Sequence, residues 1–444
     1  MNYLFSNKDL KKLIIPLIFE QALVITVGMA DTMMISSVGE AAVSGVSLVD
    51  MVNNLIFNIL AALATGGAVV TSQYIGAKKL SEARKSARQL LYTVIFSSVT
   101  VTVLVLLARE PILRLFFGSI EQDVMKNALV YLVISAISFP FLAVYNASAA
   151  LFRSMGNSQI TLKVSILINL INIIGNAFCI FVLHMGVEGV AIPSLISRAV
   201  GGMILYLLLK NPKYPVCFEK TAFALDWYTI KKILYIGIPS GIENGIFQLG
   251  RVLVVSIISG FGTVQIAANG VANNLDSVGC IIGQAMSLAM ITVIGQCVGA
   301  NDEKQIRYYT KKLLTITYIA TFLLVSSVLL ALNPILSLYG LSQETTELAY
   351  ILIMIHNGFA MLMWPVAFVL PNMLRACNDV RFTMVVSIFS MFVFRIGFSY
   401  IIGVRMGMGA IGVWIAMVID WVFRLSLFIG RYLKGSWKRL CLHP

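Results

Sequence analysis

Four oxygen-bearing side chains have the types and spacing of a binding site for a small hard cation. Asp31 lies in a long apolar segment, where a charged group is costly and commonly functional. Asn172 and Asn176 lie one helical turn apart in a later apolar segment, and Ser194 follows Pro193 in the next one. Carboxylate, amide and hydroxyl oxygens suit Na⁺, whereas soft metals prefer sulfur or imidazole. A carboxylate removed from water also binds a proton readily.

Each of these residues also has a plainer explanation. A stripe of asparagines often does no more than join two membrane helices, and Asp31 could be a buried, hydrogen-bonded carboxylate. The internal repeat described below places Val254 at the position equivalent to Asp31. A symmetric structural role would require an acid in both halves, so the asymmetry favours a coupling-ion site with Asp31 as its charged ligand.

A second set of residues could line a substrate cavity. Glu20 and Glu243 each follow a proline by four residues and are equivalent in the repeat, so both are expected near the axis between the halves. Acids there would attract organic cations; the alternative is an ion pair with Arg251 or a neighbouring lysine. Adaptable apolar and polar lining would come from four further candidates: Gln248, Met33, Met286 and Trp364.

The sequence argues against an enzyme and against a bound cofactor. Its three histidines and six cysteines are scattered without the spacing of a metal site, so the cysteines are expected to be small packing residues. It contains no GxxxxGK[ST], GxSxG or HExxH motif. Without ATP hydrolysis or covalent catalysis, an ion gradient would have to supply the energy for any transport.

Composition indicates which segments of the chain hold these residues. Of 444 residues, 59% are hydrophobic and 12% are charged, against about 25% charged in ordinary soluble domains. A span of the hydrocarbon core takes about 20 apolar residues. Twelve segments qualify: roughly 13–36, 43–75, 90–109, 127–150, 160–184, 188–209, 233–259, 266–298, 313–333, 348–374, 382–404 and 409–430. They predict an all-α protein that crosses the membrane many times.

The positive charge follows membrane topology. With the N-terminus inside, 25 of the 33 lysines and arginines fall on the cytoplasmic side, as the positive-inside rule requires. The outer side keeps only Arg109, Arg114, Lys126 and Arg405. We therefore expect both termini in the cytoplasm, with no cleaved signal peptide and no nucleic-acid partner.

An internal repeat divides the chain into two halves. One constant offset, almost half the chain, relates Pro16 and Glu20 to Pro239 and Glu243, and GVEGV at 186–190 to GAIGV at 409–413. Near the fourth span the offset shortens by one, pairing Arg153 with Arg375. The prediction is a six-helix lobe over 1–209, a cytoplasmic linker over 210–231 and a six-helix lobe over 232–444, around a central cavity.

Four motifs resemble the MATE (multidrug and toxic compound extrusion) transporters along the whole chain: ADTMMISSVGEAAVSGV, GGAVVTSQYIGAKK, the NxxxN before GVEGVAIPSLISR, and GIPSGIENGIFQLG. The resemblance implies antiport of Na⁺ or H⁺ against drugs and other organic cations. It matches Asp31, Asn172 and Ser194 to the family's cation site. Many members carry a second aspartate where this chain has Asn176, so the site holds one formal charge and the coupling ion stays open. The family's acids in the second half have a counterpart only in Glu243.

The expected function is therefore a cation-coupled antiporter that exports organic cations or drugs across the bacterial inner membrane by alternating access. A monomer suffices for this mechanism. The alternative is a lipid-linked oligosaccharide flippase of related architecture, which would line its cavity with several arginines or lysines to hold a pyrophosphate. The sequence leaves open the substrate, the stoichiometry, and whether the protein exports drugs or a metabolite.

Overall fold

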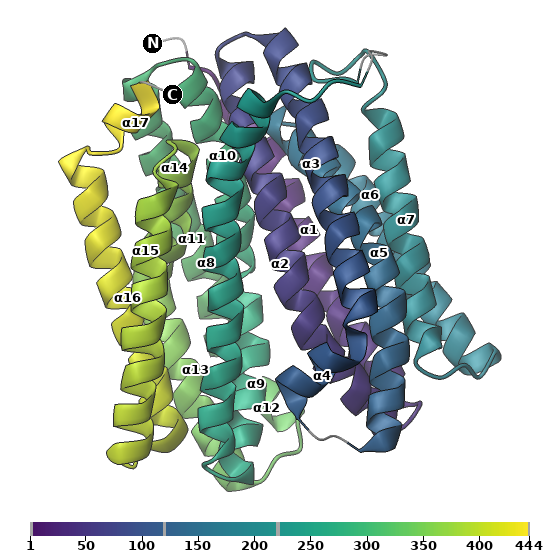
Figure 1. Cartoon of the computed structure of the whole chain (residues 1–444). Helices are drawn as coiled ribbons and strands as arrows, with labels where there is room; N and C mark the ends of the chain where they lie inside the picture. The colour runs from purple at the N-terminus through teal and green to yellow at the C-terminus, as the bar shows by residue number, and fades with distance from the viewer. Residues whose placement is uncertain (1–2, 119–120, 219–222, 443–444) are drawn as a thin grey trace. The chain divides into compact units, whose positions relative to one another are not determined.

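Every regular element of the described residues is a helix. A computed structural model describes residues 3–118, 121–218 and 223–442 (Figure 1). Twelve of the helices there are long and apolar enough to cross a membrane, which confirms the prediction of an all-α, multi-pass membrane protein. The chain forms two compact units, one of Asn7–Asn244 and one of Gly245–Pro444 with Met1–Ser6.

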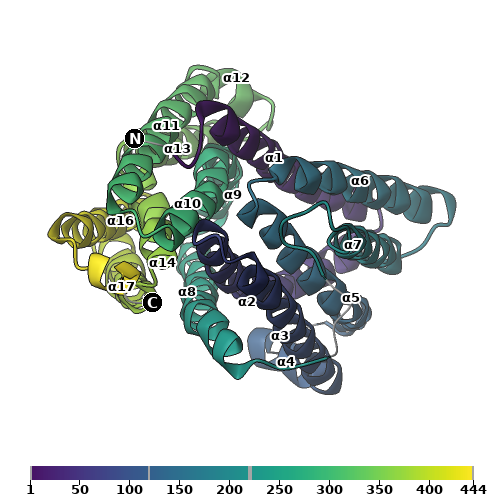
Figure 2. The ribbon, with the colours of Figure 1, turned by 90° about the horizontal axis from the view of Figure 1, so that it is seen from above.

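The first unit, called here the N-terminal unit, contains six long helices and the start of a seventh. Seen from above, α1 lies against α6, which in turn lies beside α7 (Figure 2). α2 and α7 both pack on α5, which also contacts α3. Its elements are α1 (Asn7–Ser36), α2 (Glu40–Gly76), α3 (Leu80–Leu107), the short α4 (Arg109–Phe117), α5 (Gln122–Ser154), α6 (Ser158–Ala177), the π-helical η1 (Phe178–Val182), α7 (Glu188–Leu208) and the first part of α8 (Trp227–Ser259).

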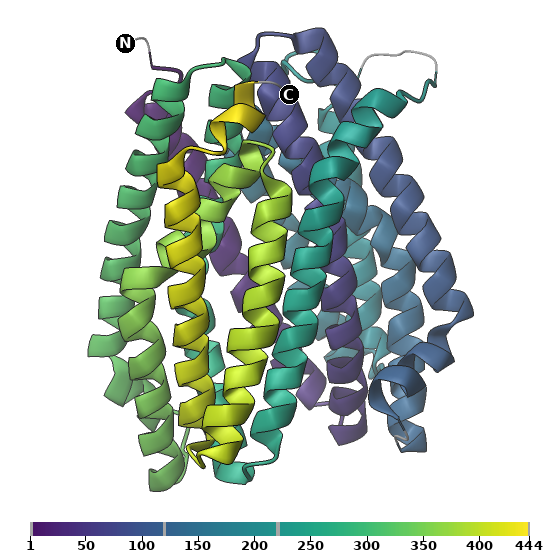
Figure 3. The ribbon, with the colours of Figure 1, turned by 60° about the vertical axis from the view of Figure 1, so that its left-hand side comes forward.

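The second unit, the C-terminal unit, repeats this plan with more π-helical turns. α13 packs against α9 and α16, and α15 runs beside α16 (Figure 3). Its elements after α8 are α9 (Thr263–Gly279), α10 (Ile281–Gly299), α11 (Glu303–Leu330), α12 (Leu332–Ser337), α13 (Gln343–Trp364), η2 (Pro365–Val369), α14 (Leu370–Ala376), α15 (Val380–Ser390), η3 (Met391–Gly397), η4 (Ser399–Arg405), α16 (Gly409–Lys434) and α17 (Lys438–Leu442).

The backbone itself shows the repeat. Residues with positive φ interrupt a helix at a fixed point, and they occur at equivalent places in both units. Three of these pairs have the same separation in the sequence as Pro16 and Pro239: Gly39 and Gly262, Lys78 and Asn301, and His184 and Gly407. Two further pairs are separated by one residue fewer: Gly118 and Gly340, and Gly156 and Asn378. The slip expected near the fourth span is thus visible, and it begins before that span.

The boundary between the units lies inside α8, after Asn244, and not in the linker predicted over 210–231. The first turns of this single long helix belong with the N-terminal unit. Residues 219–222 of that linker lie outside the described residues, but both sides of the gap are tied to α3. Arg84 donates to the Pro215 carbonyl at 3.0 Å, and Gln89 donates to the Ala224 carbonyl at 2.8 Å.

Asp226 closes the linker at the start of α8. Its carboxylate accepts a hydrogen bond from Thr229 and lies 2.9 Å from the Lys85 ammonium. These two contacts lower the pKa of Asp226 below its ordinary value. The charged carboxylate therefore fixes where α8 leaves the linker.

Both ends of the chain pack on the start of α11. The Phe5 N–H donates to the Tyr309 hydroxyl at 2.9 Å, and that hydroxyl donates to the Phe5 carbonyl at 2.8 Å. At the other end, the Lys438 ammonium lies 2.7 Å from Glu303. The two ends therefore lie at the same end of the C-terminal unit, as an even number of spans requires.

Close packing of α10 depends on a glycine. A Cβ on Gly283 would lie 1.7 Å from a ring carbon of Trp364, whose ring stacks on Phe368 at a centroid distance of 4.9 Å. Any larger residue at 283 must displace the indole.

We predict that Gly283→Ala lowers the free energy of unfolding by about 1–3 kcal/mol, because overpacking outweighs the better helix propensity of alanine. Thermal unfolding of the purified protein in detergent measures it. Gly270→Ala on α9 is the matched control, since no atom lies within 4 Å of its added Cβ. Equal unfolding temperatures for the two variants would contradict the prediction.

Candidate functional site

The four residues predicted to bind a cation come together in the N-terminal unit. Asp31 lies near the end of α1, Asn172 and Asn176 lie on α6, and Ser194 lies on α7. α1 packs along α6, and α6 packs along α7. One-turn spacing puts both asparagines on the α6 face that contacts these neighbours.

A chain of hydrogen bonds joins these side chains across three helices. The Asn176 amide donates to Asp31 Oδ1 at 2.7 Å and, more weakly, to Asn172 Oδ1 at 3.3 Å. The Asn172 amide donates to the Ser194 hydroxyl at 2.9 Å. Asn169 lies three residues before Asn172 and forms with Asn172 and Asn176 a stripe of asparagines along α6, but its amide donates to Ser165 on its own helix.

This cluster also offers a buried oxygen that is not satisfied. Asn176 is fully buried and Asn172 is 6% exposed. Among the described residues, Asn176 Oδ1 has no hydrogen-bond partner, an uncommon state for a buried polar atom. With the Asp31 carboxylate, the Asn172 amide oxygen and the Ser194 hydroxyl, it completes an all-oxygen set that fits Na⁺. That these residues bind the coupling ion remains a prediction.

A second acid lies next to this cluster. Asp50 on α2 accepts a hydrogen bond from the Tyr131 hydroxyl of α5 at 3.1 Å. Asp50 and Arg198 both lie close enough to act electrostatically on Asp31. Arg198 donates to Ser138 at 2.7 Å and its guanidinium lies 4.6 Å from the centre of the Phe57 ring. No spacing in the sequence connects Asp50 to Tyr131, 81 residues away.

Glu20 is not placed as a cavity-lining acid. Its side chain is 7% exposed and lies 3.3 Å from the Arg153 guanidinium of α5, while Thr161 of α6 donates to its other oxygen at 3.0 Å. The sequence left an ion pair open, with Arg251 or a lysine as partner, but the partner is Arg153. A buried carboxylate in a membrane protein needs such a partner, so Glu20 ties α1 to α5 and α6.

The other cavity candidates differ in exposure. Met33 is 74% exposed, whereas Met286 is fully buried in α10 and therefore cannot line an open cavity. Trp364 is half-buried against Gly283 and Phe368. Glu243 is 7% exposed and Gln248 is half-buried, both on α8. The lining role of Met33, Glu243, Gln248 and Trp364 stays a prediction.

The C-terminal unit has different chemistry in the equivalent region. A cavity of about 50 Å³ there is lined by Val254, the counterpart of Asp31, and by Arg251 and Arg395. Arg395 lies on η3, in the part of the repeat that corresponds to α6. Guanidinium groups repel a cation, so the oxygen cluster around Asp31 has no equivalent in this cavity.

Comparison with known proteins agrees with this architecture. The MatE family profile matches residues 16–178 and 239–401, two segments that begin at the equivalent prolines of the repeat. The uncharacterized transporter YisQ of Bacillus subtilis (strain 168) is 26% identical over 95% of this chain and 93% of its own length. A probable multidrug resistance protein NorM of Thermotoga maritima is 25% identical over 98% and 93%.

Among solved structures, a crystal structure of MATE in the bent conformation matches with a TM-score of 0.88 and 21% identity, over 98% of this chain and 96% of that one. It shows that the fold is shared. The family match covers both halves of the chain. The chain therefore belongs to the MatE family of multidrug efflux transporters, which are membrane carriers and not enzymes.

Proposed function

We propose that this protein exports organic cations or drugs in exchange for Na⁺ or H⁺, with Asp31 as the residue that binds the coupling ion. This proposal rests on the hydrogen bond from Asn176 of α6 to Asp31 of α1, within a cluster of oxygen-bearing side chains. Membership of a multidrug efflux family and the relative named as a probable multidrug resistance protein support the substrate class.

Coupling between the ion and the helices would arise because a bound cation changes the contacts of the Asp31 carboxylate. When the carboxylate is ionised, the Asn176 amide stabilises it by a charge-assisted hydrogen bond of 2.7 Å. Na⁺ would recruit the unsatisfied Asn176 oxygen and the Asn172 oxygen to the same carboxylate, which draws α6 and α1 together. A proton on Asp31 would instead weaken that hydrogen bond. Either event changes how α1 is held against α6.

Pro16 gives α1 a way to respond. It lies inside the 30-residue helix, where a proline removes one backbone hydrogen bond and weakens resistance to bending. Glu20, one turn further on, contacts Arg153 and Thr161, so α1 is held in place just after Pro16. A related solved structure is described as the bent conformation of MATE. We propose that cation binding at Asp31 changes the bend of α1 and thereby releases substrate.

The two six-helix repeats would then alternate access between the two sides of the membrane. Coupling requires that the ion bind these states with different affinities. The distribution of lysines and arginines supports termini in the cytoplasm, and the proposed bacterial cytoplasmic membrane would supply the ion gradient. The flippase alternative would need basic side chains that are available to bind a pyrophosphate. Arg198 already donates to Ser138 and Arg424 to Asp420, so these two arginines are not available.

The first prediction concerns transport by Asp31→Asn. In proteoliposomes, wild type should move a fluorescent organic cation when driven by a Na⁺ gradient or by a pH gradient, and the variant should lose gradient-driven transport at least tenfold. Asparagine keeps the size and accepts from Asn176 but cannot carry the charge. Asn169→Asp, on the same α6 stripe but outside the cluster, is the control for the acid added by Asn176→Asp in the second prediction.

Normal gradient-driven transport in a folded Asp31→Asn protein would contradict the role of Asp31. If wild type moves no cationic dye under either gradient, organic-cation antiport is wrong for this chain, and a lipid-linked substrate becomes the next one to assay.

The second prediction concerns Asn176→Asp. The added carboxylate would lie within hydrogen-bond distance of Asp31, and two acids so close bind a cation or share a proton. We expect about tenfold tighter Na⁺ binding, measured by calorimetry on the purified protein, if Na⁺ is the coupling ion. Asn176→Leu should abolish binding. Equal Na⁺ affinities in the aspartate and leucine variants would show that this position does not contact the ion.

A further inference from the structure

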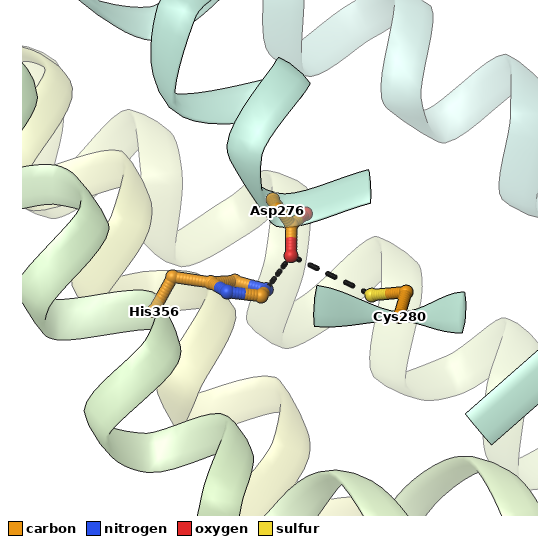
Figure 4. A group of neighbouring side chains, drawn as sticks. All are labelled: Asp276, Cys280 and His356. Carbon is orange, nitrogen blue, oxygen red and sulfur yellow. Dashed lines mark hydrogen bonds and ion pairs between the residues drawn. The ribbon is translucent and has the colours of Figure 1, made fainter. Parts of the chain in front are cut away.

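Three side chains of different chemistry face one another inside the C-terminal unit (Figure 4). The Asp276 carboxylate points between the His356 ring and the Cys280 sulfur. Its Oδ1 lies 2.5 Å from His356 Nε2 and 3.5 Å from Cys280 Sγ, and the three ligand atoms all lie within 4.8 Å of one another. The sequence had suggested that its histidines and cysteines are too dispersed for such a cluster; the fold brings one of each together.

Asp276 and Cys280 share a helix face. The Cys280 N–H donates to the Asp276 carbonyl and the Gln284 N–H donates to the Cys280 carbonyl, both at 3.0 Å, so the helical hydrogen bonds continue from α9 into α10. Residues four apart on a helix project side by side. The same spacing lets metal-binding helices present two ligands to one ion. His356 comes from α13, which packs against α9.

Aromatic neighbours hold the imidazole in place. His356 is 2% exposed, and its ring meets Trp414 edge-on at 5.6 Å and Trp421 edge-on at 4.9 Å between centroids. A ring held on two sides keeps Nε2 directed at Asp276. Asp276, with 22% of its side chain exposed, forms the more open side of the cluster.

The hydrogen bonding of His356 is compatible with metal ligation. Its Nδ1 faces the Asn357 amide oxygen at 3.4 Å. With that oxygen as the acceptor, Nδ1 carries the proton and Nε2 can present a lone pair. The 2.5 Å between Nε2 and Asp276 Oδ1 is the length of a short hydrogen bond, so the two atoms share a proton when no metal is bound. Two ligands of one tetrahedral metal, each about 2.0–2.1 Å from the ion, lie about 3.3 Å apart, so metal binding must replace this proton and separate the two atoms. A histidine that ligates through Nε2 and donates through Nδ1 is the usual arrangement in metal sites.

We propose that Asp276, Cys280 and His356 bind a divalent transition metal of the Zn²⁺ type. One imidazole nitrogen, one thiolate and one carboxylate form a donor set of intermediate softness, which suits Zn²⁺ or Co²⁺ and not Mg²⁺ or Ca²⁺. Three protein ligands leave the fourth tetrahedral position to water on the exposed side of Asp276. This site is separate from the all-oxygen cluster at Asp31 and does not depend on it.

Binding has a defined proton balance and a structural consequence. The metal forms bonds to Sγ, Nε2 and Oδ1, and it displaces the thiol proton of Cys280 and any proton shared by His356 and Asp276. Because its ligands come from the α9–α10 helix and from α13, the metal cross-links these elements and stabilises the folded C-terminal unit.

The experiment is a Co²⁺ titration of the purified, tag-free full chain. We expect one Co²⁺ per chain, with visible bands of tetrahedral Co²⁺ and a near-ultraviolet thiolate-to-cobalt charge-transfer band that excess Zn²⁺ removes. Cys280→Ser should lose the charge-transfer band, and His356→Gln should weaken binding at least tenfold. Asn357→Ala, which removes the partner of Nδ1, should weaken it by about 10–100-fold.

Cys297→Ser is the matched control, since Cys297 is a fully buried cysteine on α10, the helix that begins directly after Cys280; it should leave the spectrum unchanged. Zn²⁺ added to wild type should also release protons and raise the unfolding temperature, a readout that needs no variant to fold. Absence of stoichiometric Co²⁺ and of Zn²⁺-dependent proton release in wild type would overturn the proposal and leave a His356–Asp276 ion pair. An unchanged charge-transfer band in Cys280→Ser would overturn it equally.

Discussion

A carboxylate in a hydrocarbon-spanning helix must be neutralised or hydrogen-bonded by its neighbours, and at Asp31 the Asn176 amide provides that contact at 2.7 Å. The arrangement of the N-terminal unit follows from this need. Asn176 is fully buried, so α6 must lie against α1, and Asn172 extends the polar chain to Ser194 on α7. One hydrogen bond stabilises a single charge only partly. A site with one formal charge and an unsatisfied Asn176 oxygen is therefore the one we propose for reversible cation binding, in contrast to the paired Glu20–Arg153 site.

The two units use one backbone plan for different chemistry. Positive-φ breaks recur at the same register in both, at Gly39 and Gly262 and at Lys78 and Asn301, so the helices end at equivalent places. The side chains near the equivalent positions differ in charge. The N-terminal unit has Asp31 in an oxygen cluster, while the C-terminal cavity has Arg251 and Arg395 beside Val254. A duplicated scaffold can thus carry different side-chain chemistry in its two halves, which is why we propose cation coupling for the N-terminal unit alone.

The sequence predicted what depends on local spacing and failed where distant residues meet. Twelve apolar segments and the constant offset between the halves were enough for the fold, because span length and repeat register are properties of the chain itself. Asn172 and Asn176 could be placed on one face for the same reason. The partner of Glu20 could not be identified, since Arg153 is 133 residues away. The burial of Met286 and the meeting of His356 with Asp276 and Cys280 likewise depend on how α10 and α13 pack, which no spacing encodes.

We propose that Asp31 couples cation binding to substrate binding, and an equilibrium competition experiment measures this coupling. The affinity of purified wild type for a fluorescent organic cation would be measured at increasing Na⁺ and at decreasing pH. Antiport requires that the coupling ion and the substrate weaken each other's binding by the same factor. We expect wild type to lose affinity at least fivefold with one of the two ions, and Asp31→Asn to show no such loss. Competition of equal strength in both proteins would contradict it.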